Sequence, residues 1–290
     1  SSMVDLSRYS QNNVAILTID SDTFLMNHLK NSEFMSIPRS DSELPDCETE
    51  YFDECWAEYE FEDRTRYVGE WKDDKFHGQG NLFSQSDNYY GEFENGTLHG
   101  FGNQVLENGS IFSGIHKQGE AVYLLAHGSS NDEALLLYCE TPGEPIESCI
   151  IENKSNLPVC EIGNPLDGCL GWWHFKEDRI VYFGEWKDNT SYGWGQNFYY
   201  DKDATDWTDS MEAKGFDGER EISGEVIYRY FKGDLKGAVF KGLLWNDKLH
   251  GRASLTMDKE TLELECANVT SIEQCDVIDP KVVASTNKSE

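Results

Sequence analysis

The eight cysteines are the residues of this chain whose number and spacing indicate a definite chemistry. In chain order they fall into four local pairs, separated by 8, 10, 9 and 9 positions. An even number with recurrent local spacing is typical of disulfides between neighbouring strands, each worth roughly 2 to 3 kcal/mol for a loop of about ten residues. We expect sequential pairing, although the spacing leaves a Cys149–Cys160 bond open as an alternative. The predicted pairs are Cys47 with Cys55, Cys139 with Cys149, Cys160 with Cys169, and Cys266 with Cys275.

No residue pattern indicates a catalytic centre, a metal site or a cofactor site. No two cysteines form Cys-x-x-Cys, the spacing typical of zinc and thioredoxin-like sites. The sequence also has no nucleophile elbow, His-Glu-x-x-His helix or P-loop. His77, His99 and His250 occupy the same position of a recurring pattern and fit turns, whereas His116, His127 and His174 stand alone. We therefore expect a non-catalytic protein without a bound metal or cofactor.

A short pattern that recurs along the chain predicts the elements that hold these residues. Its two best copies, 67–80 and 89–102, read Tyr-x-Gly-Glu-aromatic followed by His-Gly-x-Gly, and Gly69 and Gly91 are 22 residues apart. Alternating aromatic residues around a polar turn are typical of a β-hairpin. One hairpin is marginal in water, so successive hairpins must stack into a sheet. We expect the glycines to let aromatic rings lie over the backbone, not to cradle phosphate.

These two copies, together with weaker ones around Gly114, Gly184 and Gly242, resemble the MORN repeat. The resemblance implies an all-β fold: an elongated antiparallel sheet of stacked MORN-type hairpins, with small capping segments at both ends. The run 224–251 looks like the last repeats of the N-terminal module of MORN-containing SET-domain lysine methyltransferases. Too few residues follow it for a SET domain. The one Asn-His pair, Asn27-His28, is followed by leucine and lies before the repeats, so the methyl-donor motif of that family is missing. The resemblance therefore implies the fold without the activity.

The repeat pattern divides the chain into three regions. We expect an N-terminal extension at 1–58, the repeat sheet at 59–260 and a C-terminal cap or tail at 261–290. The match is regular over 59–121, degenerate over 122–179 and less regular over 180–256. Inside the degenerate part, two strands at 121–126 and 134–139 are predicted to form a hairpin. The extension itself predicts a strand at 13–19 and a short helix at 22–30.

The charge balance restricts the partners that this chain can bind. Lys and Arg total 24 against 54 Asp and Glu, a formal net charge of −30. Nucleic acid and anionic lipid need clusters of cations, so neither is an expected partner. No apolar stretch reaches the roughly 18 residues that cross a bilayer, so we expect no membrane insertion.

The cysteines and six Asn-x-Ser/Thr sequons indicate the cellular compartment of this protein. Disulfides form in oxidising compartments, and the sequons are acceptors for N-linked glycan in secreted proteins. We expect a secreted, extracellular glycoprotein. The candidate glycosylation sites are Asn153 and Asn268, which lie beside cysteines, and then Asn189, Asn95, Asn108 and Asn287.

An aromatic cluster within 29 residues is the candidate binding surface. The adjacent Trp172 and Trp173 point to opposite faces if they lie on a strand, so they cannot fill one core. The predicted ligand-binding residues are Trp172, Trp173, Phe175, Trp186, Trp194, Phe198 and Tyr200.

Three functional hypotheses follow from these observations. The first is a secreted binding or assembly protein that contacts itself or another protein through a sheet edge or its aromatic face. The second is a carrier of a small apolar ligand, such as a pigment, sterol or lipid, held on that face. The third is an intracellular, non-catalytic paralogue of the methyltransferase module, which predicts free thiols and no glycan.

Overall fold

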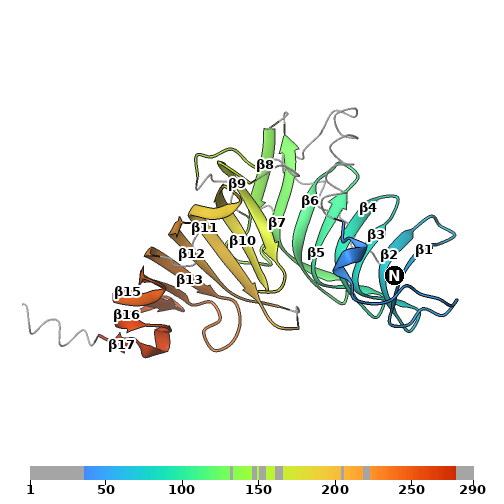
Figure 1. Ribbon diagram of the computed structural model, residues 1–290. Helices are drawn as coiled ribbons and strands as arrows, with labels where there is room; N and C mark the ends of the chain where they lie inside the picture. The colour runs from blue at the N-terminus through green and yellow to red at the C-terminus, as the bar shows by residue number, and fades with distance from the viewer. Residues whose placement is uncertain are drawn as a thin grey trace, which may run out of the picture. The chain divides into compact units, whose positions relative to one another are not determined.

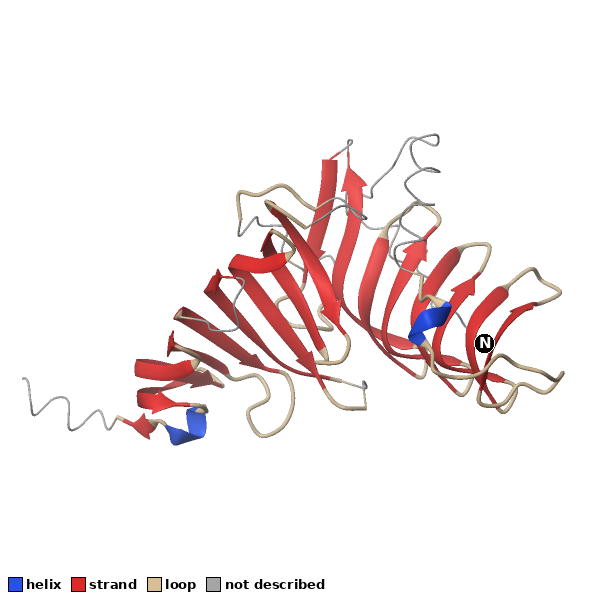
Figure 2. Cartoon of the chain, in the orientation of Figure 1, coloured by secondary structure: helices blue, strands red, loops and turns tan. Residues whose placement is uncertain are grey.

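The computed structural model describes residues 36–130, 133–145, 149, 155–160, 166–203, 206–217 and 223–278. Within these residues the regular elements are strands and two turns of 3-10 helix, η2 (Arg39–Asp41) and η4 (Ile272–Gln274) (Figure 2). The strands form an eight-stranded and a nine-stranded antiparallel sheet, each with its strands in chain order (Figure 1). The all-β class and the stacked hairpins are confirmed, but the strands form two sheets where the sequence predicts one.

The first sheet runs from β1 to β8 and lies in the first of two units, which comprises residues 1–152, 161–164 and 202–206. Its strands are β1 (Cys55–Glu60), β2 (Arg66–Lys72), β3 (Lys75–Phe83), β4 (Asp87–Glu94), β5 (Thr97–Leu106), β6 (Ile111–Lys117), β7 (Glu120–Ser130) and β8 (Glu133–Tyr138).

The second sheet runs from β9 to β17 and lies in the second unit, residues 153–160, 165–201 and 207–290. Its strands are β9 (Cys169–Phe175), β10 (Ile180–Lys187), β11 (Thr190–Tyr200), β12 (Trp207–Asp217), β13 (Gly224–Tyr230), β14 (Val239–Trp245), β15 (Lys248–Met257), β16 (Glu260–Val269) and β17 (Asp276–Val277).

The degenerate part of the repeat continues the first sheet. β7 and β8 pair as an antiparallel hairpin with Leu125 opposite Tyr138, as predicted. β7 is longer than expected because it continues through the predicted turn to Ser130. The strand and helix predicted at 13–19 and 22–30 lie outside the described residues.

Each regular hairpin is held by a tyrosine that lies over two paired glycines. Gly69 faces Gly80 across β2 and β3, and a Cβ atom on either glycine would overlap the Tyr67 hydroxyl. Tyr67 itself is fully buried, in a cluster with Trp71, Tyr89 and other apolar side chains on this face of the sheet. The glycines therefore let the ring lie over the backbone, as predicted from the sequence.

The same tyrosine donates to backbone carbonyl groups beside a shift in strand register. The register of β2 and β3 shifts between Gly69 and Glu70, a β-bulge that interrupts the backbone ladder. Tyr67 Oη donates to the Glu70 carbonyl at 2.9 Å and to the His77 carbonyl at 3.2 Å. The Glu70 carboxylate accepts the Gln79 N–H at 3.1 Å. Tyrosine, glycine and glutamate of the repeat thus form one hydrogen-bonded unit.

This hydrogen-bonded arrangement of tyrosine, glycine and glutamate recurs in both sheets at the corresponding positions. Register shifts follow Gly91 in β4 and Gly184 in β10. Tyr89 Oη donates to the Glu92 carbonyl at 3.3 Å, and Tyr182 Oη donates to the Glu185 carbonyl at 3.0 Å. The recurrence explains the sequence period, because every regular hairpin needs the same three residue types.

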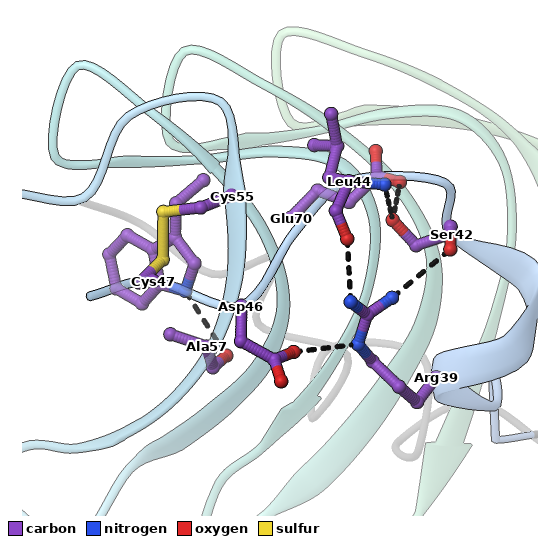
Figure 3. A network of polar contacts seen from close by, with 9 residues as sticks. Arg39, Ser42, Leu44, Asp46, Cys47, Cys55, Ala57 and Glu70 are labelled. Atoms are coloured by element: carbon purple, nitrogen blue, oxygen red, sulfur yellow. Dashed lines mark hydrogen bonds and ion pairs between the residues drawn. A yellow bond between two sulfur atoms is a disulfide. The ribbon is translucent and has the colours of Figure 1, made fainter.

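The open edge of the first sheet is covered by residues 42–47, which we call the first edge strap (Figure 3). Its Cys47 N–H donates to the Trp56 carbonyl at 2.9 Å, and the Trp56 N–H donates to the Pro45 carbonyl at 2.7 Å. A disulfide between Cys47 and Cys55 fixes the strap to β1. The strap therefore pairs both backbone groups of Trp56, so that this part of the edge no longer offers them to another chain.

Side chains hold the first edge strap in one conformation. Ser42 Oγ donates to the Glu70 carboxylate at 2.5 Å. Arg39 donates from its guanidinium to the carbonyl groups of Ser42 and Leu44, at 3.0 and 2.5 Å, and to the Asp46 carboxylate at 2.9 Å (Figure 3). The Glu70 carboxylate therefore joins the strap to the β-bulge of the first hairpin.

Residues 155–160 form a second edge strap with the same sequence pattern, Ser-x-Leu-Pro-x-Cys. Cys160 N–H donates to the Leu170 carbonyl at 2.8 Å, and Leu170 N–H donates to the Pro158 carbonyl at 2.7 Å. A Cys160–Cys169 disulfide fixes the second edge strap to β9. These contacts reproduce those of the first edge strap one by one.

The equivalence of the two units extends from the straps into their hairpins. Ser155 Oγ donates to the Glu185 carboxylate, as Ser42 does to Glu70. The two serines are 113 positions apart and the two glutamates 115. The units are therefore two copies of one structural plan, beginning with a strap, a disulfide and a regular hairpin.

The two remaining disulfides lie toward the opposite ends of the sheets. Cys139 follows β8 and bonds to Cys149. Cys266 lies in β16 and bonds to Cys275, next to the edge strand β17. The sequential pairing is thus confirmed for all four bonds, and the Cys149–Cys160 alternative is wrong.

Replacement of Gly80 by alanine tests the packing of the tyrosine over the glycines. We expect Gly80→Ala to destabilise the protein by about 1 to 3 kcal/mol, because the new methyl group overlaps the Tyr67 ring. Urea unfolding measures the change. As a control, Gly80→Ala should be less destabilising in a Tyr67→Leu background, where the ring is gone. Equal costs in both backgrounds would contradict the packing account.

Candidate functional site

The aromatic cluster predicted to bind ligand is divided between the two faces of the second sheet. Antiparallel partners share a face, and Trp173 lies opposite Tyr182 whereas Trp172 lies opposite Phe183. Tyr182 contacts Trp186, and Phe183 contacts Trp194, with ring centroids 5.0 and 5.7 Å apart.

The remaining members of the cluster follow the same division. Phe175 lies on the face of Trp173, two positions along β9. Phe198 and Tyr200 both contact Trp207, with centroids 6.2 and 5.9 Å apart. Trp186, Trp194, Phe198 and Tyr200 are buried, whereas Trp173 and Phe175 are each 40% exposed. Of the seven predicted residues, these two offer the largest exposed aromatic surface on one face.

A cavity of about 370 Å³ lies on the tyrosine-bearing face of the first sheet. This volume is within the range of about 300 to 1,000 Å³ that small-molecule sites occupy. β3 to β7 all contribute to its wall, so the register of the hairpins determines its shape. Its apolar wall consists of Phe76, Leu82, Tyr89, Phe93, Leu98 and Tyr123.

Polar side chains line one part of the cavity and form a chain of hydrogen bonds. Tyr123 Oη donates to Gln104 Oε1 at 2.9 Å, and Gln104 Nε2 donates to the Asp87 carboxylate. The hydroxyl groups of Ser84 and Ser86 donate to the other Asp87 oxygen at 2.9 and 2.8 Å. This carboxylate is thus engaged by three side chains of the protein itself.

His116 is the polar residue of the cavity whose ring remains without hydrogen bonds. Its side chain is 1% exposed, and neither ring nitrogen has a hydrogen-bond partner. The ring lies edge-on to Tyr89 and Tyr123, with centroids 5.0 and 5.9 Å away. Buried polar atoms are normally paired, so an unpaired histidine on a cavity wall is the feature most in need of a functional explanation.

Burial keeps the His116 ring neutral. Removal from water lowers its pKa to about 4. The ring also contacts the backbone of Gly114 and Gly100, outside regular hydrogen-bond geometry, and these contacts raise the pKa by less than burial lowers it. A neutral imidazole has one N–H donor and one acceptor nitrogen. The cavity wall therefore offers both hydrogen-bonding roles from one residue.

The repeat itself contained a signal for this site that the sequence analysis missed. Two positions after the strand glycine, regular hairpins carry Trp71, Phe93 or Trp186, and the third hairpin carries His116. A histidine at a position that is otherwise aromatic departs from the local rule of the fold, and such departures concentrate at functional sites.

The other isolated histidines lie elsewhere. His174 is in β9, and its Nε2 is 2.8 Å from the Tyr200 hydroxyl. His127 is in β7, and burial lowers its pKa to about 4. In the described part of the chain, no group of three or more His, Cys, Asp or Glu side chains is arranged to bind a metal ion. None of the helical turns in that part has the length and apolar character needed to span a membrane.

Acid should destabilise the protein partly through His116. Its pKa of about 4 in the folded chain lies below the ordinary value of 6.5, so its contribution is complete above pH 6.5 and is lost as the pH falls toward 4. Between pH 7 and 4.5 we expect a loss of about 2 to 3 kcal/mol from this residue. Urea unfolding of the wild type and His116→Phe at both pH values measures it.

His250→Gln is the control, because it changes an exposed histidine. The wild type and this control should lose stability equally, and His116→Phe should lose less. An unchanged pH dependence in His116→Phe would contradict the neutral, buried state of the ring.

Comparison with known proteins supports a MORN-repeat protein. The family model of the MORN repeat matches residues 67–86 and 89–111, which cover most of the hairpins β2–β3 and β4–β5. A comparison with curated proteins finds no match to this chain. The resemblance of 224–251 to the methyltransferase module is not shown by these findings and stays a prediction. The first two regular hairpins are thus similar in sequence to MORN repeats, and the other hairpins share their antiparallel arrangement.

Proposed function

We propose that this chain is a non-catalytic binding protein of an oxidising, extracellular compartment. The observation that carries the proposal is the pairing of all eight cysteines in four disulfides. Disulfides persist in extracellular compartments and are rare where glutathione keeps thiols reduced. The third hypothesis, an intracellular paralogue, predicts free thiols and does not explain four disulfides. The sequence similarity to MORN repeats supports a binding role, because stacked hairpins present extended faces.

The sequons add support from their positions. Asn95 and Asn189 are exposed residues in the turns of hairpins, and Asn268 is exposed at the end of β16. A glycan on any of these residues would extend into solvent without disturbing a sheet face. Asn108 is half-buried, and its Oδ1 accepts the Ser110 N–H at 3.0 Å. The sequons at Asn153 and Asn287 lie outside the described residues.

Binding through a sheet face is favoured over assembly through sheet edges. Each edge strap forms a bridge to the first strand of its sheet, β1 or β9, and occupies part of an edge at which a further strand would otherwise add. The outer strands at the other two edges are β8 and β17, and β17 is only two residues long. By contrast, the second sheet exposes Trp173, Phe175, Leu243 and Trp245, the last to 65%. Exposed aromatic residues are typical anchors for a protein partner, so this sheet is the candidate surface for the assembly role.

The carrier role is the second candidate function. It is favoured by the cavity of the first sheet, which has the size and apolar lining of a small-molecule site. The two roles are compatible because they use different sheets.

Intact mass spectrometry tests the compartment. The chain, expressed with a secretory leader in animal cells, should be lighter by eight hydrogen atoms before reduction than after it, since all cysteines are paired. Glycosidase treatment should lower the mass further. Thr270→Ala removes the sequon at Asn268 without changing the asparagine, and we expect it to remove one glycan. Eight free thiols and no glycan would contradict the proposal and favour the intracellular hypothesis.

A further inference from the structure

We propose that the cavity of the first sheet binds a small, neutral, planar molecule that carries a hydroxyl group, with His116 as its polar anchor. This inference rests on the proposed binding function and gives it a site and a ligand class. The site differs from the aromatic cluster that the sequence indicated, because it lies in the other sheet and is centred on a histidine.

The cavity exists because the repeat departs from its own pattern at this point. His116 pairs with Gly100 in the neighbouring strand, as Phe93 pairs with Gly78 one hairpin earlier. An imidazole is smaller than the phenyl or indole ring that otherwise fills this position. The smaller ring of His116 leaves space on the face of the sheet, and it is polar at a position where the regular hairpins carry an apolar ring.

The wall of the cavity fits a planar, apolar body. Phe76 and Phe93 meet edge to face, with centroids 5.8 Å apart. Tyr89 meets Phe93 in the same way at 5.2 Å, and Leu82 and Leu98 complete the apolar surface. Aromatic side chains favour offset and edge-on contacts with another ring. A flat ligand can therefore contact several of these rings at once.

The charges of the cavity exclude an anionic ligand. Asp87 lines the cavity, and no lysine or arginine is among the lining residues. A carboxylate or phosphate group would approach a negative charge without a compensating cation, in a region removed from water. A cationic ligand would gain little binding energy from Asp87, since three side chains already donate hydrogen bonds to its carboxylate. A neutral ligand is the class that remains.

His116 selects for a hydroxyl group within that class. The neutral ring has an unpaired donor and an unpaired acceptor, and a hydroxyl group is both a donor and an acceptor. Gln104 and Tyr123 are bonded to each other, so their orientation is fixed before the ligand arrives. The energetic gain on binding would come from satisfying polar atoms that are otherwise buried without partners.

Two probes of matched shape test this site: 2-naphthol and 2-methylnaphthalene, which differ by a hydroxyl in place of a methyl group. Titrations of the whole chain, followed by the fluorescence of each probe, give the two dissociation constants. We expect 2-naphthol to bind about tenfold more tightly, as one added hydrogen bond in a buried site predicts. The ring ¹⁵N signals of His116 should shift when 2-naphthol binds and stay in place with 2-methylnaphthalene.

Three variants locate the binding. His116→Phe restores the residue type of Phe93 and should abolish the preference for 2-naphthol. Leu98→Trp fills the cavity and should remove binding of both probes. Trp173→Ala changes the predicted cluster in the other sheet and should leave both affinities unchanged. If Leu98→Trp fails to fold, His116→Phe and the histidine signals still decide the result.

The proposal is overturned if 2-naphthol fails to saturate the wild type, or if His116→Phe and Leu98→Trp bind as the wild type does. Equal affinity for the two probes would contradict the proposal that the ligand carries a hydroxyl group. Loss of binding in Trp173→Ala alone would move the site to the second sheet. Failure of the proposed function itself is separate, since free thiols and the absence of glycan would be seen in the mass spectrum whatever the probes do.

Discussion

The structure depends on the packing of one tyrosine over two glycines in each regular hairpin. The register of the two strands shifts directly after the first glycine, in a β-bulge, and the tyrosine hydroxyl donates to backbone carbonyl groups beside it. Tyr67, Tyr89 and Tyr182 each donate to the carbonyl group of the glutamate three residues later. Their rings reach that position only because glycines lie beneath them. Tyrosine, glycine and glutamate must therefore change together, which explains why the pattern recurs so regularly.

A sheet built from such hairpins has two open edges and a thin core, and the disulfides compensate for both. Cys55 and Cys169 hold the edge straps on β1 and β9, and the other two bonds lie toward the opposite ends of the sheets. Each bond restricts a short loop in the unfolded chain, which stabilises the folded state. The edge strap adds a specific role, because its serine joins the carboxylate of the first bulge. In both halves of the chain, the edge strap and the first regular hairpin are thus connected by hydrogen bonds.

The cavity lies where this network is interrupted. In the third hairpin Phe112 stands at the position of the tyrosine and Ile115 at that of the glutamate, so the hydroxyl and carboxylate of the repeat are both absent. His116 then replaces the aromatic residue of the core. Loss of the regular unit would normally weaken a repeat sheet, but the neighbouring hairpins and the Asp87–Gln104–Tyr123 hydrogen bonds hold the strands in register. The cavity therefore lies at a hairpin that departs from the pattern, next to hairpins that follow it.

The sequence by itself determined the hairpins and their period and favoured the four sequential disulfides, because these depend on residues close together in the chain. Turn residues, alternating aromatics and cysteines 8 to 10 positions apart act locally. The tertiary structure decided what depends on strand parity and on long-range pairing. It divided the strands into two sheets, and it buried Trp186 and Trp194 while it left Trp173 partly exposed. It also brought Phe76, His116 and Tyr123, from three different strands, to one cavity. A local pattern cannot predict such a meeting, because the register of several successive strand pairs sets it.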